Sequence, residues 1–193
     1  MRRWAAVTAA TMILAGCASG DAPGAPATPT AVACPEGLVD PTPVEHGLGV
    51  GEPASTAPSL GSATQAWLCT YAAIGTESTE PSGGSVYIWN LAKGPAEVPA
   101  ERLGDVDALV SSLVPADDMR ECTADLGPRV MLVVVAGGTT TGVVVDDYGC
   151  RDVRLTDDPW EVAPGESTSD GVPAGVLQGP DGMIAELDTL AGL

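Results

Sequence analysis

The feature that most constrains the fold is a run of apolar, mostly β-branched residues at 129–136, which reads Arg-Val-Met-Leu-Val-Val-Val-Ala. A nearly continuous run of this kind predicts a central strand that is buried on both faces. Gly137 and Gly138 follow it and predict a tight turn, after which 140–146 is expected to run back as a second strand. The run therefore indicates a sheet with strands on either side.

Alternation of apolar and polar residues with a period of two predicts three further strands, at 64–72, 85–91 and 150–155. In the last of these, the apolar residues are expected to face the core. Asp152 and Arg154 alternate with them and are expected to face solvent. The sheet is thus predicted to be antiparallel and twisted, with about five strands.

Helical spacing of apolar residues between 101 and 114 predicts one main amphipathic helix, which Pro115 is expected to end. Ile184, Leu187 and Leu190 predict a short C-terminal helix. The chain has 24 glycines and 17 prolines. Most other segments are rich in these two residues and are expected to be long irregular arms. The predicted fold class is α+β.

The N-terminus has the three parts of an export signal. It has two arginines, an apolar stretch at 4–14 and the sequence Leu14-Ala15-Gly16-Cys17. The apolar stretch is shorter than the roughly 20 residues that a membrane-spanning helix needs. The last four residues resemble a bacterial lipobox. That resemblance implies that the Cys17 thiol carries diacylglycerol and that cleavage removes the signal peptide 1–16.

Residues 17–33 follow as a tether rich in Pro, Ala and Thr, and 34–193 are expected to form a single α+β domain. Lipidation of Cys17 leaves four other cysteines, and an even number in an oxidising compartment predicts two disulfides. They are Cys34, Cys69, Cys122 and Cys150. Four cysteines allow three pairings. The predicted hairpin brings the chain at Cys122 and Cys150 to one end of the sheet, which favours that pair and leaves Cys34–Cys69.

Charge excludes one class of partner. The chain has 26 acidic against 8 basic residues, for a net charge of −18, and nucleic acid is therefore not expected as a partner. Asp146, Asp147 and Glu121 are weak candidates for a calcium site, because their spacing lacks the regular pattern of calcium loops. A solvated acidic rim explains the same residues.

No cofactor is predicted, because the glycine-rich stretches lack the following lysine of a phosphate-binding loop. His46 is the single histidine, so neither a Ser-His-Asp triad nor a typical zinc site is expected. No catalytic residue is assigned. An alternative hypothesis is a hydrolase that uses carboxylates between Asp117 and Asp158.

The aromatic residues are the strongest candidates for binding. Four of them share one parity of two consecutive predicted strands, namely Trp67, Tyr71, Tyr87 and Trp89. If exposed, they would suit stacking on sugar rings or a partner protein. In a chain without phenylalanine they also suit a core, which we favour. Trp160 lies in a predicted loop, is expected to be exposed, and is the best single candidate for a surface contact.

The composition combines abundant Ala, Gly, Val, Asp and Pro with a single lysine. Together with the lipobox, it resembles small uncharacterised lipoproteins of actinobacterial cell envelopes. The resemblance implies a lipid-anchored protein on the extracytoplasmic face of the cell membrane. It does not indicate a particular activity. Our leading hypothesis is a non-enzymatic binding module for an envelope protein, a wall polymer or a small ligand. The alternatives are a carboxylate-dependent extracellular hydrolase and an inhibitor of extracellular enzymes.

Overall fold

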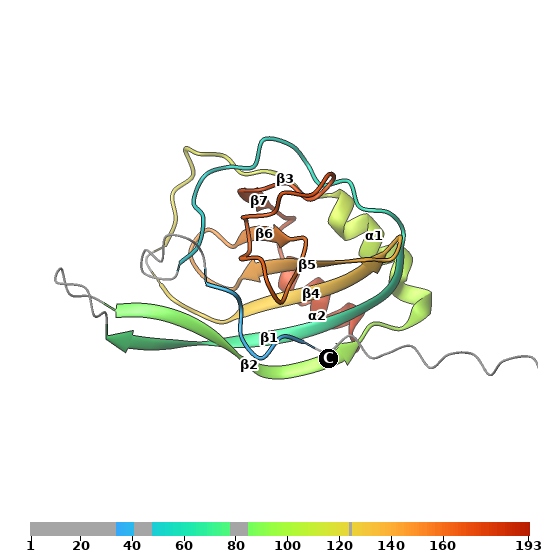
Figure 1. Ribbon diagram of the computed structural model, residues 1–193, viewed down its shortest axis with the longest axis horizontal. Helices are drawn as coiled ribbons and strands as arrows, with labels where there is room; N and C mark the ends of the chain where they lie inside the picture. Colours follow the sequence, from blue (N-terminus) through green and yellow to red (C-terminus); the bar gives the residue numbers. More distant parts are fainter. Residues whose placement is uncertain (1–33, 41–47, 78–84, 124) are drawn as a thin grey trace, which may run out of the picture. The chain divides into compact units, whose positions relative to one another are not determined.

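The computed structural model describes residues 34–40, 48–77, 85–123 and 125–193. These residues belong to one compact unit and form an antiparallel sheet with two helices, which confirms the α+β class (Figure 1). The sheet has seven strands in the described part of the chain, rather than the five predicted. The predicted signal peptide, the predicted lipidation site Cys17, the predicted tether and His46 lie outside the described residues.

The strands lie side by side in the order β2-β1-β4-β5-β6-β7-β3. Their bounds are Ala63–Glu77 for β1, Ser85–Glu97 for β2, Val114–Pro115 for β3, Arg129–Ala136 for β4, Thr139–Asp146 for β5, Asp152–Thr156 for β6 and Val176–Gln178 for β7. The apolar run that predicted a central strand is β4, and it is buried at every position but one. The prediction of an interior strand is therefore confirmed.

The predicted hairpin forms from β4 and β5. Arg129 lies opposite Asp146 at its open end, and Ala136 lies opposite Thr139 at its turn. Gly137 and Gly138 form the turn with φ values of 58° and 85°. Both values lie in the left-handed region that glycine adopts without steric cost, and two such residues match the twist of a two-residue hairpin.

Strands β3 and β7 were not predicted. β7 pairs with β6 on one side and with β3 on the other, so it completes the sheet with only three residues. The helix predicted over 101–114 is shorter than expected. Its start is the 3-10 turn η1 (Ala100–Arg102), the α-helix α1 covers only Leu103–Ser111, and the chain is already extended at β3. The short C-terminal helix is α2 (Met183–Leu190). Within the described residues, neither helix is long and apolar enough to span a bilayer.

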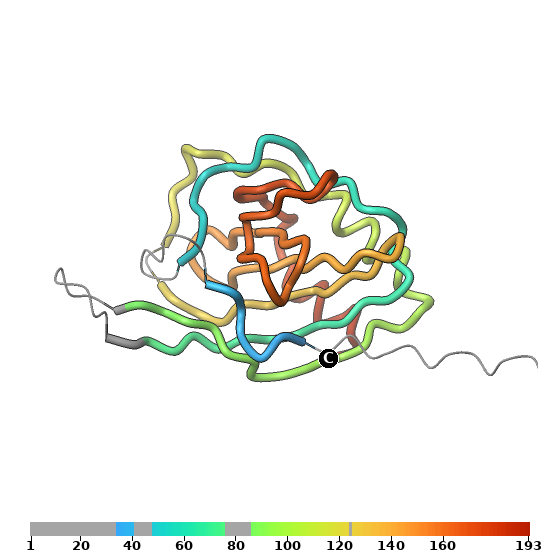
Figure 2. The backbone as a smooth tube through the Cα atoms, viewed as in Figure 1, coloured from blue at the N-terminus to red at the C-terminus, as the bar shows by residue number. Residues whose placement is uncertain are grey.

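Both faces of the sheet are covered (Figures 1 and 2). Apolar residues of α1 and α2 pack with one face and form the larger core cluster. The other face packs against the segment 34–40, which crosses in front of β1 and β2 in Figures 1 and 2 and hydrogen-bonds to β2. Cys34 and Leu38 of that segment belong to the second cluster. Most residues of the inner strands β4, β5 and β6 are therefore protected from solvent on both faces.

The predicted aromatic face belongs to this second cluster. Trp67, Tyr71 and Trp89 are 5%, 0% and 2% exposed, and Tyr87 is half-buried against them. The four side chains do share one face, and they form core there, as favoured. Trp67, Tyr71 and Trp89 therefore do not form an exposed surface for stacking on sugar rings, and of the predicted aromatic candidates Tyr87 and Trp160 remain accessible.

The structure has the two favoured disulfides, Cys34–Cys69 with 5.9 Å between the Cα atoms and Cys122–Cys150 with 4.6 Å. The first ties the segment 34–40 to β1. Gly94 lies beside it with a φ of 110°, and a Cβ atom there would come within 2.7 Å of the Leu68 carbonyl oxygen. Only glycine fits at this position of β2.

Candidate functional site

An unusual group of charged residues lies inside the second core cluster, at one end of β4, β5 and β6. Arg129 Nε lies 2.7 Å from Asp146 Oδ1, and Arg154 Nη1 lies 2.7 Å from Asp146 Oδ2. All three side chains are about 95% buried. Arg154 was expected to face solvent, and that prediction was wrong because irregular chain covers this face of the sheet as well.

The ion pairs continue to the edge of the molecule. Arg154 Nη2 lies 2.8 Å from Asp152 Oδ2, and Arg120 Nη2 lies 2.8 Å from Asp152 Oδ1. We call these five residues the arginine–aspartate cluster: Arg120, Arg129, Asp146, Asp152 and Arg154. Its charges alternate in sign, and both oxygens of each carboxylate have an arginine partner. Charges removed from water require this degree of pairing.

The arginines also hold the irregular chain that covers them. Arg129 Nη2 donates to the carbonyl of Leu48 at 2.6 Å, and Arg154 Nε donates to the carbonyl of Val50 at 2.7 Å. An arm rich in glycine and proline has few apolar side chains to bury. Charge-assisted hydrogen bonds from buried guanidinium groups fix it instead.

Two aromatic rings complete the environment of Arg129. Its Cζ lies 3.7 Å from the centroid of the Trp89 ring, and Trp89 stacks on Tyr148 with centroids 6.1 Å apart. Arg129 Nη2 also donates to the Tyr148 hydroxyl oxygen at 2.8 Å. Burial, together with the charge of Asp146, raises the pKa of Tyr148 to about 12. The phenol is therefore neutral at physiological pH.

A cavity of about 420 Å³ lies over this cluster, and we call it the disulfide cleft. Asp146, Asp152 and Arg154 form its charged part, and Tyr87, Tyr148 and the cysteines 122 and 150 line it further. Leu48 and Leu126 belong to the same lining and are 42% and 40% exposed. The cleft thus combines fully paired charges with two solvent-exposed leucines.

Asp125 adds an exposed carboxylate to the lining of this cleft. It accepts hydrogen bonds from the Thr123 hydroxyl and from the backbone N–H of Gly149. These bonds, that from Thr123 first, hold the pKa of the Asp125 carboxyl below its ordinary value. The cleft therefore presents an ionised, oriented hydrogen-bond acceptor near its leucines.

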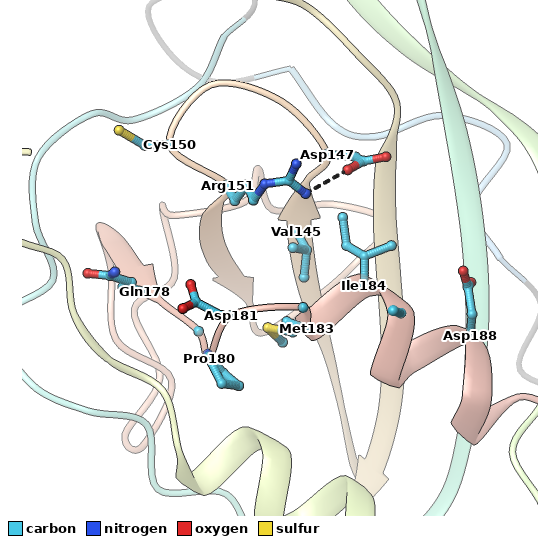
Figure 3. A pocket seen from close by; sticks show the side chains of 13 residues that line it. Val145, Asp147, Cys150, Arg151, Gln178, Pro180, Asp181, Met183, Ile184 and Asp188 are labelled. Atoms are coloured by element: carbon cyan, nitrogen blue, oxygen red, sulfur yellow. Dashed lines mark hydrogen bonds and ion pairs between the residues drawn. The ribbon is translucent and has the colours of Figure 1, made fainter. Parts of the chain in front are cut away.

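A second cavity, of about 320 Å³, lies between the 147–151 turn and α2 (Figure 3). Val145 and Met183, both buried, belong to its lining, together with Asp181 and Asp188. Val145 belongs to the core on the helix face, whereas its neighbour Asp146 faces the disulfide cleft. The two cavities therefore lie on opposite faces of the sheet, at the end of β5.

The calcium site considered from the sequence does not form. Both oxygens of Asp146 are occupied by arginines, Asp147 pairs with Arg151 at 3.0 Å, and Glu121 is exposed. Among the described residues, no three His, Cys, Asp or Glu side chains are placed to hold a metal ion. Asp146 is thus a structural counter-ion for two arginines.

Sequence reasoning missed the arginines of the cluster. Their signal was scarcity, since Arg129 and Arg154, two of only eight basic residues, lie within predicted strands. Trp160 is 43% exposed on the turn after β6, as predicted.

Comparisons with protein-family models, with curated proteins and with solved structures find no match to this chain. The candidate site therefore stands on its geometry.

Proposed function

We propose that this protein is a lipid-anchored binding module on the extracytoplasmic face of a bacterial cell membrane, and that the disulfide cleft holds its ligand. The anchor rests on the lipobox resemblance at Cys17. The two disulfides suit an oxidising compartment outside the cytoplasm. The single observation that carries the binding role is the pair of exposed leucines, Leu48 and Leu126, on a pre-formed cleft with a charged interior.

The chemistry of the lining defines the class of ligand. Each charge of the cluster has a partner of opposite sign within the protein, so the cluster gives the cleft a fixed polar wall. A ligand that covers Leu48 and Leu126 removes apolar surface from water, which contributes roughly 25 cal/mol of binding free energy for each Å² covered. Asp125 offers a charged acceptor beside them. A matching ligand has an apolar body and a hydrogen-bond donor.

Lipidation is tested by mass spectrometry of the mature protein from a bacterial host that processes lipoproteins. We expect an N-terminus at Cys17 that carries acyl chains, and recovery of the protein with the membrane fraction. Cys17→Ala is expected to lose the acyl mass and membrane retention, because only a thiol forms the thioether. The neighbouring change Ser19→Ala is the matched control and should leave both unchanged. An unmodified N-terminus after residue 17 in the parent protein would contradict the anchor.

The cleft is tested with the neutral dye Nile red, whose fluorescence rises in an apolar environment. We expect saturable binding to the mature protein, and Leu126→Asp should weaken it about tenfold or more, because a charge then occupies the apolar side of the cleft. Met119→Asp, in the same loop and 83% exposed, is the control and should bind the dye normally. Equal binding by both variants would place the apolar site elsewhere and reject the disulfide cleft.

A further inference from the structure

A second surface feature lies away from the disulfide cleft, on the turn that follows β6. Trp160 is 43% exposed there, whereas Trp67 and Trp89 are buried. The Asp158 side chain accepts a hydrogen bond from the Trp160 backbone N–H at 3.0 Å. The backbone carbonyl of Asp158 accepts one from the Val162 N–H at 2.9 Å. These bonds fix the backbone beneath the exposed indole, so little conformational entropy is lost when a ligand stacks on it.

Asp157 lies three residues before Trp160, and only one of its two carboxylate oxygens accepts hydrogen bonds. Oδ2 accepts from the backbone N–H groups of Thr168 and Ser169 and from the Ser169 hydroxyl. Oδ1 is buried without a partner, and it is the one side-chain oxygen or nitrogen in that state among the described residues. Burial raises the pKa of Asp157, but hydrogen bonds from Ser169 and Thr168 outweigh it and hold the pKa below its ordinary value.

A buried acceptor without a donor is unfavourable, and native proteins rarely keep one without a reason. A ligand that brings a hydroxyl donor to Asp157 would remove this cost. Because Oδ1 is buried in the free protein, a hydroxyl reaches it only if atoms around Asp157 move. Ligand binding should therefore change the environment of the indole.

Trp160 and Asp157 line a cavity of about 270 Å³ together with Thr140, Asp158 and Pro159. The lining contains a flat aromatic ring, two carboxylates and one hydroxyl, and it contains no basic side chain. Asp158 Oδ1 accepts the hydrogen bond from the Trp160 backbone N–H, whereas Oδ2 takes no part in that bond. The cavity thus offers one apolar face for stacking beside several hydrogen-bond acceptors.

We infer that Trp160 and Asp157 form a docking site for a ring of an uncharged glycan. The apolar face of the sugar ring stacks on the indole, and its hydroxyls donate to Asp157 and Asp158. An anionic polymer is disfavoured by the net charge of −18 and by the acidic lining. A small cation is disfavoured because one open indole does not surround it as an aromatic cage does.

The glycan site goes beyond the proposed disulfide cleft, and its test depends on neither that cleft nor Cys17. The mature protein is titrated by calorimetry with neutral oligosaccharides of glucose, galactose, mannose, arabinose or N-acetylglucosamine. We expect at least one to bind, with a change in indole fluorescence and no loss of affinity at high salt. Trp160→Ala should lower the affinity about tenfold or more, and Trp160→Phe should retain part of it.

Two variants separate the site from general effects. Asp157→Asn replaces the unpaired acceptor by a donor and should weaken binding, whereas Met119→Ala, an exposed apolar change elsewhere, should not. Failure of every neutral oligosaccharide to bind overturns the inference, as does full affinity in Trp160→Ala. Salt-sensitive binding of tetramethylammonium or oligogalacturonate at Trp160, in place of a neutral sugar, overturns it as well.

Discussion

Replacing Asp146 by asparagine is expected to be the most damaging single change in this protein. Asparagine keeps the shape of the side chain but removes the charge that lies 2.7 Å from both Arg129 and Arg154. Two guanidinium groups would then remain about 95% buried without the carboxylate between them. Breaking a single buried ion pair costs about 3–5 kcal/mol. With two partners affected, the loss of unfolding free energy should reach at least the upper part of that range.

The next residue provides a matched control. Asp147 pairs with Arg151 at 3.0 Å, but their side chains are 38% and 66% exposed. Exposed pairs contribute roughly 0–1 kcal/mol, so Asp147→Asn should change stability by less than about 1 kcal/mol. Urea unfolding curves followed by circular dichroism measure both variants. Similar losses for Asp146→Asn and Asp147→Asn would show that the buried position of Asp146 adds nothing.

Opening the Cys34–Cys69 disulfide is expected to have the second largest effect. The bridge closes a loop of 35 residues, and the chain-entropy estimate for a loop of this length is about 4 kcal/mol. Both cysteines are also buried, at 7% and 0% exposure, among the aromatic residues of the second core cluster. The double variant Cys34→Ala, Cys69→Ala therefore loses packing as well as the constraint on the unfolded chain.

The other disulfide separates these two contributions. Cys122–Cys150 spans 28 residues, so its entropic contribution is nearly the same, but Cys122 is exposed. We expect Cys122→Ala, Cys150→Ala to lose less unfolding free energy than Cys34→Ala, Cys69→Ala, by about 1 kcal/mol or more. Urea midpoints and slopes of both double variants measure the difference. An equal or larger loss on opening Cys122–Cys150 would contradict a packing role for Cys34 and Cys69.

The sequence predicted those parts of the fold that depend on local pattern. The apolar run of β4, the Gly137-Gly138 turn and the register that places Arg129 opposite Asp146 all follow from short-range rules. Strand β7 could not be found in this way. It has three residues between segments rich in Gly and Pro, and it is extended because β6 and β3 pair with it. Pairing between distant segments leaves no periodic signal in so short a strand.

The candidate sites show the same division. Exposure of Trp160 follows from its neighbours Asp158 and Pro159, which favour a turn. The error at Arg154 has a specific cause: alternation assigns one polar face to a strand, but this sheet is covered on both faces, by helices on one and by irregular chain on the other. The unpaired oxygen of Asp157 depends on which of its two oxygens Ser169 contacts. That choice is three-dimensional and has no counterpart in residue order.

The bridge between Cys34 and Cys69 also determines how the fold takes up mechanical tension. A pull on the chain before Cys34 passes through the sulfur atoms directly to Cys69 in β1, so it bypasses the chain that leads from Cys34 to the start of β1 while the bridge is intact. The force then reaches a strand that is hydrogen-bonded to β2 on one side and to β4 on the other. Tension applied before Cys34 would therefore load the paired part of the sheet first and spare the irregular arm whose carbonyls accept hydrogen bonds from Arg129 and Arg154.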